Sequence, residues 1–352
     1  MSFYIIFGLI MFGVLIFIHE LGHFLAAKKC GVGIYEFAIG MGPKLISRKG
    51  KDGVTYSLRL FPIGGFVSMH GEDDDENAQN DETSLAKKSV LQRFTVISAG
   101  AVMNILLGLI IAALLVIFGG DLYSTKVDRF MVVNREGVPY TDDFQGLHPG
   151  DEIIKVGNRR INIRHDLMYE AMNIVNEPCD LTVIRDGEKV IIKDFYFPTI
   201  TEKGIVFGTA AFFIPTKLEK TIPEVIKQTF CQSVSVLRAI WTSLIDTLRG
   251  RYGVEAISGP VGVVSEMKEV EESGGMPSLF FMMMVISMNL GLVNLLPFPA
   301  LDGGRLLFLI IEAIRKKPLN PKIESAINAA GLILLMGLMV FVTFSDITKL
   351  IK

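Results

Sequence analysis

The stretch FYIIFGLIMFGVLIFIHELGHFLAA, residues 3–27, decides the fold of this chain. As a helix rising about 1.5 Å per residue, it is long enough to cross the apolar core of a bilayer. Only three of its side chains are charged or carry an imidazole ring, and they stand close together as His19, Glu20 and His23. Such groups are costly inside a membrane and usually have a function there. The stretch therefore predicts a membrane-spanning helix that carries a functional site.

The residues His19-Glu20-Leu21-Gly22-His23 form an H-E-x-x-H pattern. Positions i and i+4 share one face of a helix, so both histidines can bind one zinc ion while Glu20 lies beside the metal as a general base. The alternative is a chance pattern with a structural role, which the apolar setting disfavours because each unpaired group would be penalised there. A zinc site needs a third protein ligand, and this helix does not supply it.

The composition is typical of a membrane protein. Half of the residues are hydrophobic, and 35 basic residues nearly balance 37 acidic ones, which gives no indication of nucleic-acid binding. Cys30, Cys179 and Cys231 are too few and too scattered for a disulfide framework or a cysteine zinc site. The N-terminus lacks the basic start of a signal peptide, so we expect the first helix to be retained.

Long uncharged runs predict four transmembrane helices, at about residues 3–27, 94–119, 277–311 and 326–344. Lysine and arginine cluster after the first run, before the second and between the last two, and such clusters mark cytoplasmic loops. Both termini and the region from about 121 to 275 are therefore expected outside the cell membrane. The acidic run at residues 72–76 is expected to be a solvated cytoplasmic loop.

Short β-type runs at residues 34–39, 44–48, 54–60 and 65–69 alternate with glycine-containing turns. They predict a small sheet against the inner face of the membrane. An open edge near Gly64 and Gly65 could pair with an extended substrate strand, since peptide hydrolysis needs the scissile bond outside a helix. A structural hairpin beneath the helices explains the same runs equally well.

The soluble region around residues 127–198 contains Gly146-Leu-His-Pro-Gly150-Asp151, which runs from a turn into a strand, followed by a hairpin pattern around Asp186-Gly187. Gly146, Gly150 and Asp151 make this region resemble a bacterial PDZ domain. Such domains bind extended peptides by strand addition, although a globular spacer that limits access by its bulk is an open alternative. Residues 222–248 then predict an amphipathic helix at the outer membrane surface.

The third hydrophobic segment offers the missing ligand. Asp302 lies in a long uncharged region just after Pro297 and Pro299, which would break a helix. It can complete a His-His-Asp zinc site and leave the fourth position to water. The first and third segments both run from outside to inside, so we expect His23 and Asp302 at similar depth. The alternative is an aspartate that caps the restarting helix.

Three motifs together resemble a known family. They are His19-Glu20-x-x-His23, Asn294-x-x-Pro297-x-Pro299-x-Leu301-Asp302-Gly303, and the PDZ-like region between the central spans. The chain is similar to the site-2 protease family of intramembrane zinc metalloproteases, specifically its bacterial RseP/RasP type (peptidase family M50B). The resemblance extends over nearly the whole chain.

The resemblance implies a multi-pass α-helical membrane protein with four transmembrane helices, a membrane-associated β-hairpin or sheet, and an inserted extracytoplasmic PDZ domain of α+β type. The predicted parts are transmembrane helix 1 (1–27), a cytoplasmic loop with the sheet (28–93), helix 2 (94–120), the PDZ domain (121–202), an amphipathic juxtamembrane region (203–275), helix 3 with its broken segment (276–314), a cytoplasmic loop (315–325) and helix 4 (326–346).

The implied activity is hydrolysis, within the bacterial inner (cytoplasmic) membrane, of peptide bonds in single-span proteins already trimmed by an upstream site-1 protease. Anti-sigma factors and signal-peptide remnants are the expected substrates. Zn²⁺ is the expected cofactor, with His19, His23 and Asp302 as ligands and Glu20 as the catalytic base. Residues expected to hold the unwound substrate are Asn294, Pro297, Pro299, Gly64 and Gly65. A membrane metal transporter and a catalytically silent PDZ scaffold are the alternatives, and neither would need Glu20 between two metal ligands.

Overall fold

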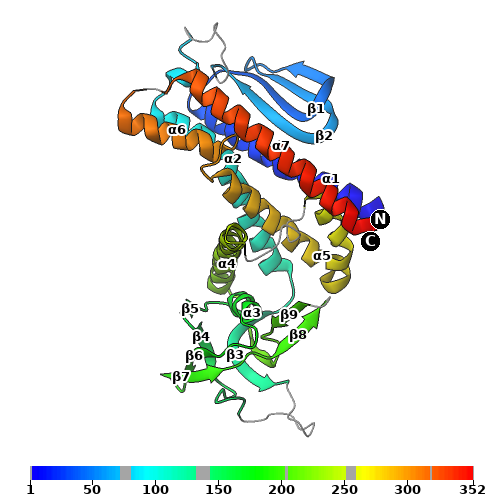
Figure 1. Ribbon diagram of the computed structural model, residues 1–352, viewed down its shortest axis with the longest axis vertical. Coiled ribbons are helices and arrows are strands. Elements are labelled where there is room, and N and C mark those ends of the chain that lie inside the picture. Colours follow the sequence, from blue (N-terminus) through cyan, green and yellow to red (C-terminus); the bar gives the residue numbers. More distant parts are fainter. Residues whose placement is uncertain are drawn as a thin grey trace. The chain divides into compact units, whose positions relative to one another are not determined.

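The computed structural model describes residues 2–71, 81–131, 143–202, 205–250, 259–317 and 319–351 (Figure 1). The acidic run at 72–76 lies outside the described residues. The chain forms two compact units. One comprises residues 1–111 and 243–352 and contains the predicted metal ligands, and the other comprises residues 112–242.

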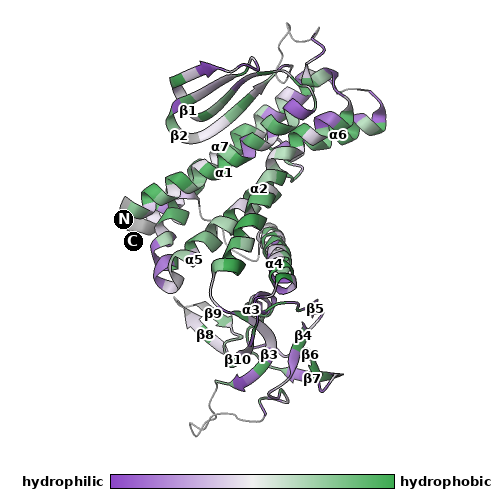
Figure 2. Ribbon diagram, turned by 180° about the vertical axis from the view of Figure 1, so that it is seen from behind, coloured by the Kyte–Doolittle hydropathy of each residue, from purple (hydrophilic) through white to green (hydrophobic). Residues whose placement is uncertain are grey.

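Within the described ranges, four helices are long and apolar enough to cross a membrane, as the sequence predicts. They are α1 (Ser2–Lys29), α2 (Val90–Phe118), α5 (Pro260–Asn294) and α7 (Pro321–Ile351). Figure 2 shows α1 and α2 in hydrophobic colours along most of their length. The chain is therefore a multi-pass membrane protein.

Helix α5 begins 16 residues before the expected start of the third span, since it runs from Pro260 instead of residue 276. Gly275, with φ of 67°, and Pro277 kink it. The charged residues of α5 all precede this kink, so the part that follows is the apolar span expected from the sequence. The chain leaves α5 at Asn294 and restarts as a separate amphipathic helix, α6 (Asp302–Arg315).

The predicted cytoplasmic sheet is built from two long, bent strands, β1 (Ile34–Lys49) and β2 (Thr55–Met69). Residues 34–39 of β1 lie between two parts of β2, because Ile39 pairs with both Gly65 and Leu58. Residues 44–49 pair with the other side of residues 55–59. Among the described residues, 65–69 pair along one side only, so this segment forms an edge of the sheet.

The sheet packs on the second half of α1. Phe24 and Phe37 have ring centroids 4.9 Å apart and belong to one buried cluster with Val67 and Val96. After β2, a short 3-10 helix, η2 (Leu85–Lys87), adds Leu85 to the same cluster. Burial of these apolar side chains fixes the edge segment beside the helix that carries the histidines.

The inserted unit contains a six-stranded sheet in the order β10-β3-β4-β6-β7, with β5 paired to β4. Its helix α3 packs near a separate hairpin. The elements are β3 (Leu122–Phe130), β4 (Glu152–Val156), β5 (Arg159–Arg160), α3 (Arg164–Asn173), β6 (Cys179–Arg185), β7 (Glu188–Phe195), β8 (Thr199–Glu202), β9 (Ile205–Gly208) and β10 (Phe213–Leu218). The sheet therefore extends 16 residues beyond the expected domain boundary at 202, because β10 returns to pair with β3.

The predicted hairpin around Asp186-Gly187 is confirmed, since Arg185 pairs with Glu188. Both turn residues have positive φ, of 50° and 88°, which is the two-residue turn that suits strand twist. Arg185 also makes a bidentate ion pair with the wholly buried Asp151, through contacts of 2.8 and 2.7 Å. Asp151, the aspartate of the PDZ-like motif, thus fixes the end of strand β6.

Helix α4 (Ile222–Leu248) exposes apolar side chains at a helical spacing, at Ile222, Ile226 and Phe230. Its polar residues Ser233 and Ser235 are buried instead, and the ring of His165 in α3 lies 3.1 Å from the Ser235 hydroxyl. This arrangement reverses that of a helix on a water-soluble domain, and the place of α4 at a membrane surface stays a prediction.

Asp346 near the end of α7 is a buried carboxylate, and no sequence pattern predicts its role. Its Oδ2 accepts hydrogen bonds from the backbone N–H groups of Gly259 and Gly262, both 2.9 Å long. A Cβ at either glycine would lie about 3 Å from this carboxylate. The Gly-Pro-Val-Gly start of α5 therefore lets α7 cap its N-terminus.

Candidate metal centre

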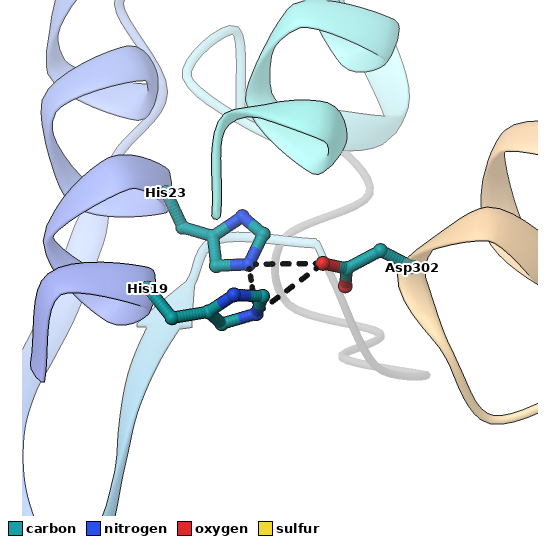
Figure 3. Close-up of side chains that lie close together, drawn as sticks. All are labelled: His19, His23 and Asp302. Carbon is teal, nitrogen blue, oxygen red and sulfur yellow. Dashed lines mark hydrogen bonds and ion pairs between the residues drawn. The ribbon is translucent and has the colours of Figure 1, made fainter. Parts of the chain in front are cut away.

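His19 and His23 lie one turn apart on α1 and project from the same side of the helix (Figure 3). Their Nε2 atoms are 3.2 Å apart, and the two rings meet edge to face with centroids 4.8 Å apart. This arrangement follows directly from the i, i+4 spacing. The H-E-x-x-H pattern thus places two nitrogen ligands at one point.

Asp302 reaches the same point as the first residue of α6. The preceding loop folds back tightly, since a Cβ at Gly303 or Gly304 would lie 2.0 or 2.4 Å from the carbonyl oxygens of Leu296 and Phe298. Ala300 has φ of 70°, and its N–H donates to Asn328 of α7 over 3.3 Å. Two glycines and one hydrogen bond therefore turn the carboxylate toward the histidines.

The three ligand atoms form a nearly equilateral triangle. Asp302 Oδ2 lies 3.3 Å from His19 Nε2 and 3.5 Å from His23 Nε2. In a tetrahedral site with zinc–ligand bonds of about 2.0–2.1 Å, neighbouring ligand atoms are about 3.3–3.4 Å apart. Asp302 Oδ2 is also buried without a well-formed hydrogen bond among the described residues. Donor types, spacing and this orphaned oxygen all fit a zinc ion.

Residues of helix α2 contact both histidines. His23 Nδ1 lies 2.9 Å from the carbonyl oxygen of Val96, which can only accept, so Nδ1 carries a proton, and in the neutral ring Nε2 then keeps its lone pair. Gly100 faces the imidazole rings so closely that a Cβ there would lie 2.3 Å from His23 Nε2. A Cβ at Gly22 would lie 2.4 Å from the Ala99 carbonyl oxygen. The two helices meet through glycines at the metal centre.

A cavity of about 470 Å³ opens beside the three ligands and Glu20. The edge segment of the sheet contributes Phe66, Val67 and Met69 to one wall, and α6 and α7 contribute polar residues to another. Gly65 lies directly against Glu20, since a Cβ there would be 3.3 Å from Glu20 Cγ. The remaining lining residues are Ile97, Ala300, Leu301, Arg305, Ser325, Asn328, Ala329 and Leu332.

Comparison with known proteins identifies the family. The model of peptidase family M50 matches residues 7–338. The chain belongs to peptidase family M50. It is 36% identical over 345 residues to a Clostridium perfringens protein named as a zinc metalloprotease, with 98% of each chain covered. It is 30% identical to the regulator of sigma-W protease RasP of Bacillus subtilis and to the zinc metalloprotease RasP of Geobacillus kaustophilus, each with 97% of both chains covered.

The protein is therefore an intramembrane zinc metalloprotease of family M50, as the sequence predicts. Its cofactor is Zn²⁺. Neither a metal transporter nor a catalytically silent scaffold is favoured by these relationships.

The predicted substrate-binding residues of this M50 peptidase lie at the end of α5, in the loop before Asp302 and in β2. Asn294 is half-buried at the end of α5, and Pro297 and Pro299 lie in the loop that leads to Asp302. Gly64, with φ of 91°, turns the chain into the edge segment. Of the described residues, the cavity lining includes the neighbouring Phe66 and Val67 but none of the five predicted residues, Gly65 included.

The structure adds Gly100, Asn104 and Asn328 to the surroundings of the candidate metal centre of this peptidase. Asn104 Nδ2 lies 3.2 Å from His19 Nδ1, and Asn328 holds the loop before Asp302. A polar amide in the apolar run 94–119 was a usable signal, because such groups are costly in a membrane. A glycine one turn before Asn104 gives no such signal, because its role depends on what faces it.

Proposed function

We propose that His19, His23 and Asp302 hold the zinc ion of this peptidase and that Glu20 is its general base. The observation that carries this proposal is the triangle of ligand atoms, with sides of 3.2, 3.3 and 3.5 Å. Glu20 lines the same cavity and is not one of the three residues of the triangle, as expected for a general base that acts beside the metal.

Each residue has a distinct task in peptide hydrolysis. When bound, zinc lowers the pKa of a coordinated water molecule to about 7 and polarises the scissile carbonyl group. Glu20 accepts a proton from the attacking water and delivers it to the leaving amine nitrogen. His23, held by the Val96 carbonyl, and Asp302, held by its folded loop, keep the ligand set fixed while the peptide bond breaks.

We infer that the substrates are single-span membrane proteins already trimmed by an upstream site-1 protease, with anti-sigma factors and signal-peptide remnants as the expected classes. The name of the Bacillus subtilis relative, a regulator of sigma-W protease, supports the first class. The inner (cytoplasmic) membrane of the cell is the proposed location, and the four helices that are long and apolar enough to span a membrane support a reaction within a bilayer. The ligands lie within the apolar part of the chain, so the cleaved bond is inside the bilayer.

The substrate is proposed to bind as an extended strand along residues 65–69. This segment pairs with β1 on one side, and it lies against Glu20 at Gly65. Phe66 and Val67 line the cavity, so a strand added at this edge would pass the metal centre. Gly64 turns the chain into this edge. Asn294 at the end of α5, and Pro297 and Pro299 in the loop before Asp302, are also proposed to contact the substrate. Asn294 is proposed to hydrogen-bond the unwound substrate backbone.

Residues that weaken a helix at the cleavage point are expected to speed hydrolysis. A helical substrate hides its carbonyl groups in the i to i+4 ladder, and each glycine in place of alanine lowers helix stability by about 1 kcal/mol. Two model substrates, one with leucine and one with glycine or asparagine at the cleavage point, should differ roughly fivefold in rate per weakened residue. Cleavage in detergent micelles, followed by mass spectrometry of the products, measures this.

In the same assay, Asn294→Ala should slow hydrolysis of both substrates and leave the zinc content unchanged. Equal rates for a polyleucine span and a glycine-containing span would show that unwinding does not limit the reaction. That result would contradict the extended-strand mode of binding.

The inserted unit is proposed to be an extracytoplasmic PDZ domain that docks substrates or excludes large ones. The buried Asp151–Arg185 pair, the confirmed hairpin and α3 beside the sheet support this proposal. The domain organisation is otherwise proposed as expected from the sequence, with the PDZ domain extended to the end of β10 at Leu218. Helix α4 is proposed to lie at the outer membrane surface on its apolar face.

Removal of the PDZ domain is expected to loosen substrate choice without removing the chemistry. Leu122 pairs with Leu218, so residues 122–218 can be deleted and the two ends joined by a short glycine-serine linker. The deletion should keep about one zinc per chain and lose no more than about tenfold in cleavage of a short substrate, a change of ~1.4 kcal/mol. It should also newly cleave substrates that retain a bulky extracytoplasmic domain. Complete inactivity in a deletion that binds zinc would contradict this separation of roles.

A further inference from the structure

The side chain of Asn104 in α2 is wholly buried beside the metal centre. Its Nδ2 lies 3.2 Å from His19 Nδ1, while its Oδ1 is buried and has no hydrogen-bond partner among the described residues. A buried carbonyl oxygen without a hydrogen-bond donor is destabilising. A hydrogen-bond donor that reaches Oδ1 would therefore stabilise the buried side chain of Asn104.

His19 supplies that donor when it acts as a metal ligand. The atom it turns toward His23 and Asp302 is Nε2, at 3.2 and 3.3 Å. A neutral histidine that binds a metal through Nε2 carries its proton on Nδ1. An amide that turns over by 180° exchanges its nitrogen and oxygen, which brings Oδ1 to the Nδ1 proton of His19. The Nδ1 proton of His19 and Oδ1 of Asn104 then form one hydrogen bond, and Nδ2 takes the former place of Oδ1.

We propose that Asn104 is a positioning residue that accepts the Nδ1 proton of His19 and so fixes the tautomer and ring orientation of this zinc ligand. The proposal rests on the proposed zinc site. It gives the two histidines equivalent support from α2, since His23 Nδ1 already donates to the Val96 carbonyl over 2.9 Å. One histidine is held by a backbone oxygen and the other by a side-chain oxygen two turns further along.

The backbone at Asn104 is itself held firmly. The hydroxyl of Ser287 in α5 donates to the Asn104 carbonyl oxygen over 2.7 Å, and Ser287 is wholly buried. Gly291, one turn further along α5, approaches so closely that a Cβ there would lie 2.7 Å from the Ala101 carbonyl oxygen. Packing on α5 thus sets the position from which Asn104 reaches His19, and a rigid support of this kind preserves ligand geometry.

Three variants separate acceptor chemistry from simple packing. Asn104→Asp keeps an acceptor at this position, whereas Asn104→Leu keeps the approximate volume and removes the acceptor, and Asn104→Ala removes both. Ser287→Ala is the matched control, because it loosens the backbone contact of Asn104 and leaves its side chain intact. The measurements are zinc affinity by competition with a chelator and the visible absorption spectrum of the purified full-length protein loaded with Co²⁺.

We expect Asn104→Leu and Asn104→Ala to lower zinc affinity by about 10–100-fold, the usual loss when an outer hydrogen-bond partner of a metal ligand is removed. Both should shift the Co²⁺ absorption bands, because His19 loses its fixed orientation. Asn104→Asp should restore the affinity to within about threefold of the wild type. Ser287→Ala should lower the affinity by less than Asn104→Leu does, because the acceptor at position 104 is retained.

Wild-type affinity and an unchanged Co²⁺ spectrum in both Asn104→Leu and Asn104→Ala would overturn the role of Asn104 while leaving the zinc site standing. Equal losses in the aspartate and leucine variants would also overturn it, because shape and not the acceptor would then matter. Absence of zinc from the wild-type protein would overturn the proposed site itself, and this role with it.

Discussion

Glu20→Gln is expected to retain about one zinc per chain and to lose cleavage by a factor on the order of 10²–10⁴. Glutamine has nearly the same shape as glutamate, but its amide cannot take a proton from water at neutral pH. Glu20 lines the cavity and stands outside the triangle formed by His19, His23 and Asp302, so the metal ligands are untouched. Metal analysis and a cleavage assay on the same preparation measure both quantities.

Glu20→Asp is the informative companion, since it keeps a carboxylate and withdraws it by one methylene group. We expect its rate to fall between those of the wild type and Glu20→Gln. Zinc loss in Glu20→Gln, or cleavage at the wild-type rate, would show that Glu20 is not the general base. The single-span fragment that accumulates in cells carrying Glu20→Gln would identify the physiological substrate.

Gly100→Ala is expected to reduce zinc affinity by roughly 100-fold or more, although residue 100 donates no ligand atom. The added methyl group would lie 2.3 Å from His23 Nε2 and 2.8 Å from His19 Cε1, which is too close for either ring to stay in place. His23 is also tied to the Val96 carbonyl, so it has little freedom to retreat. Chelator competition on the purified protein measures the loss.

Two further variants set the scale for this experiment. The doubly substituted His19→Ala, His23→Ala protein should contain almost no zinc, and full occupancy there would refute the assigned ligands. Gly108→Ala adds the same methyl group two turns further along α2, where it meets the flexible side chain of Met288 at 2.5 Å. We expect Gly108→Ala to keep its zinc. If Gly100→Ala binds zinc as tightly as Gly108→Ala does, then α2 does not pack against the metal centre as described.

The sequence by itself determined the membrane class, the four spans and the H-E-x-x-H pair. These follow from local rules, because apolar length decides whether a helix crosses a bilayer and the i, i+4 spacing places His19 and His23 on one face. The Asp186-Gly187 hairpin was equally local, since both residues tolerate positive φ. Asp302 could be predicted from the sequence, because a lone carboxylate in an uncharged membrane segment is energetically costly and usually has a function.

Only the tertiary structure showed the roles of residues that depend on their neighbours in the folded chain. Gly100, Asn104 and Asn328 carry no local pattern, and their roles come from an imidazole ring or a loop that packs against them. The role of Asp346 likewise depends on its hydrogen bond with the start of α5, which is distant in the sequence. The sheet of the inserted unit extends to Leu218, beyond the boundary expected at residue 202, because β10 pairs with β3 about 90 residues earlier. Pairing between strands that are distant in the sequence has no short-range signal. Sequence periodicity reports which face is buried, whereas only the packed structure reports the neighbour that buries it.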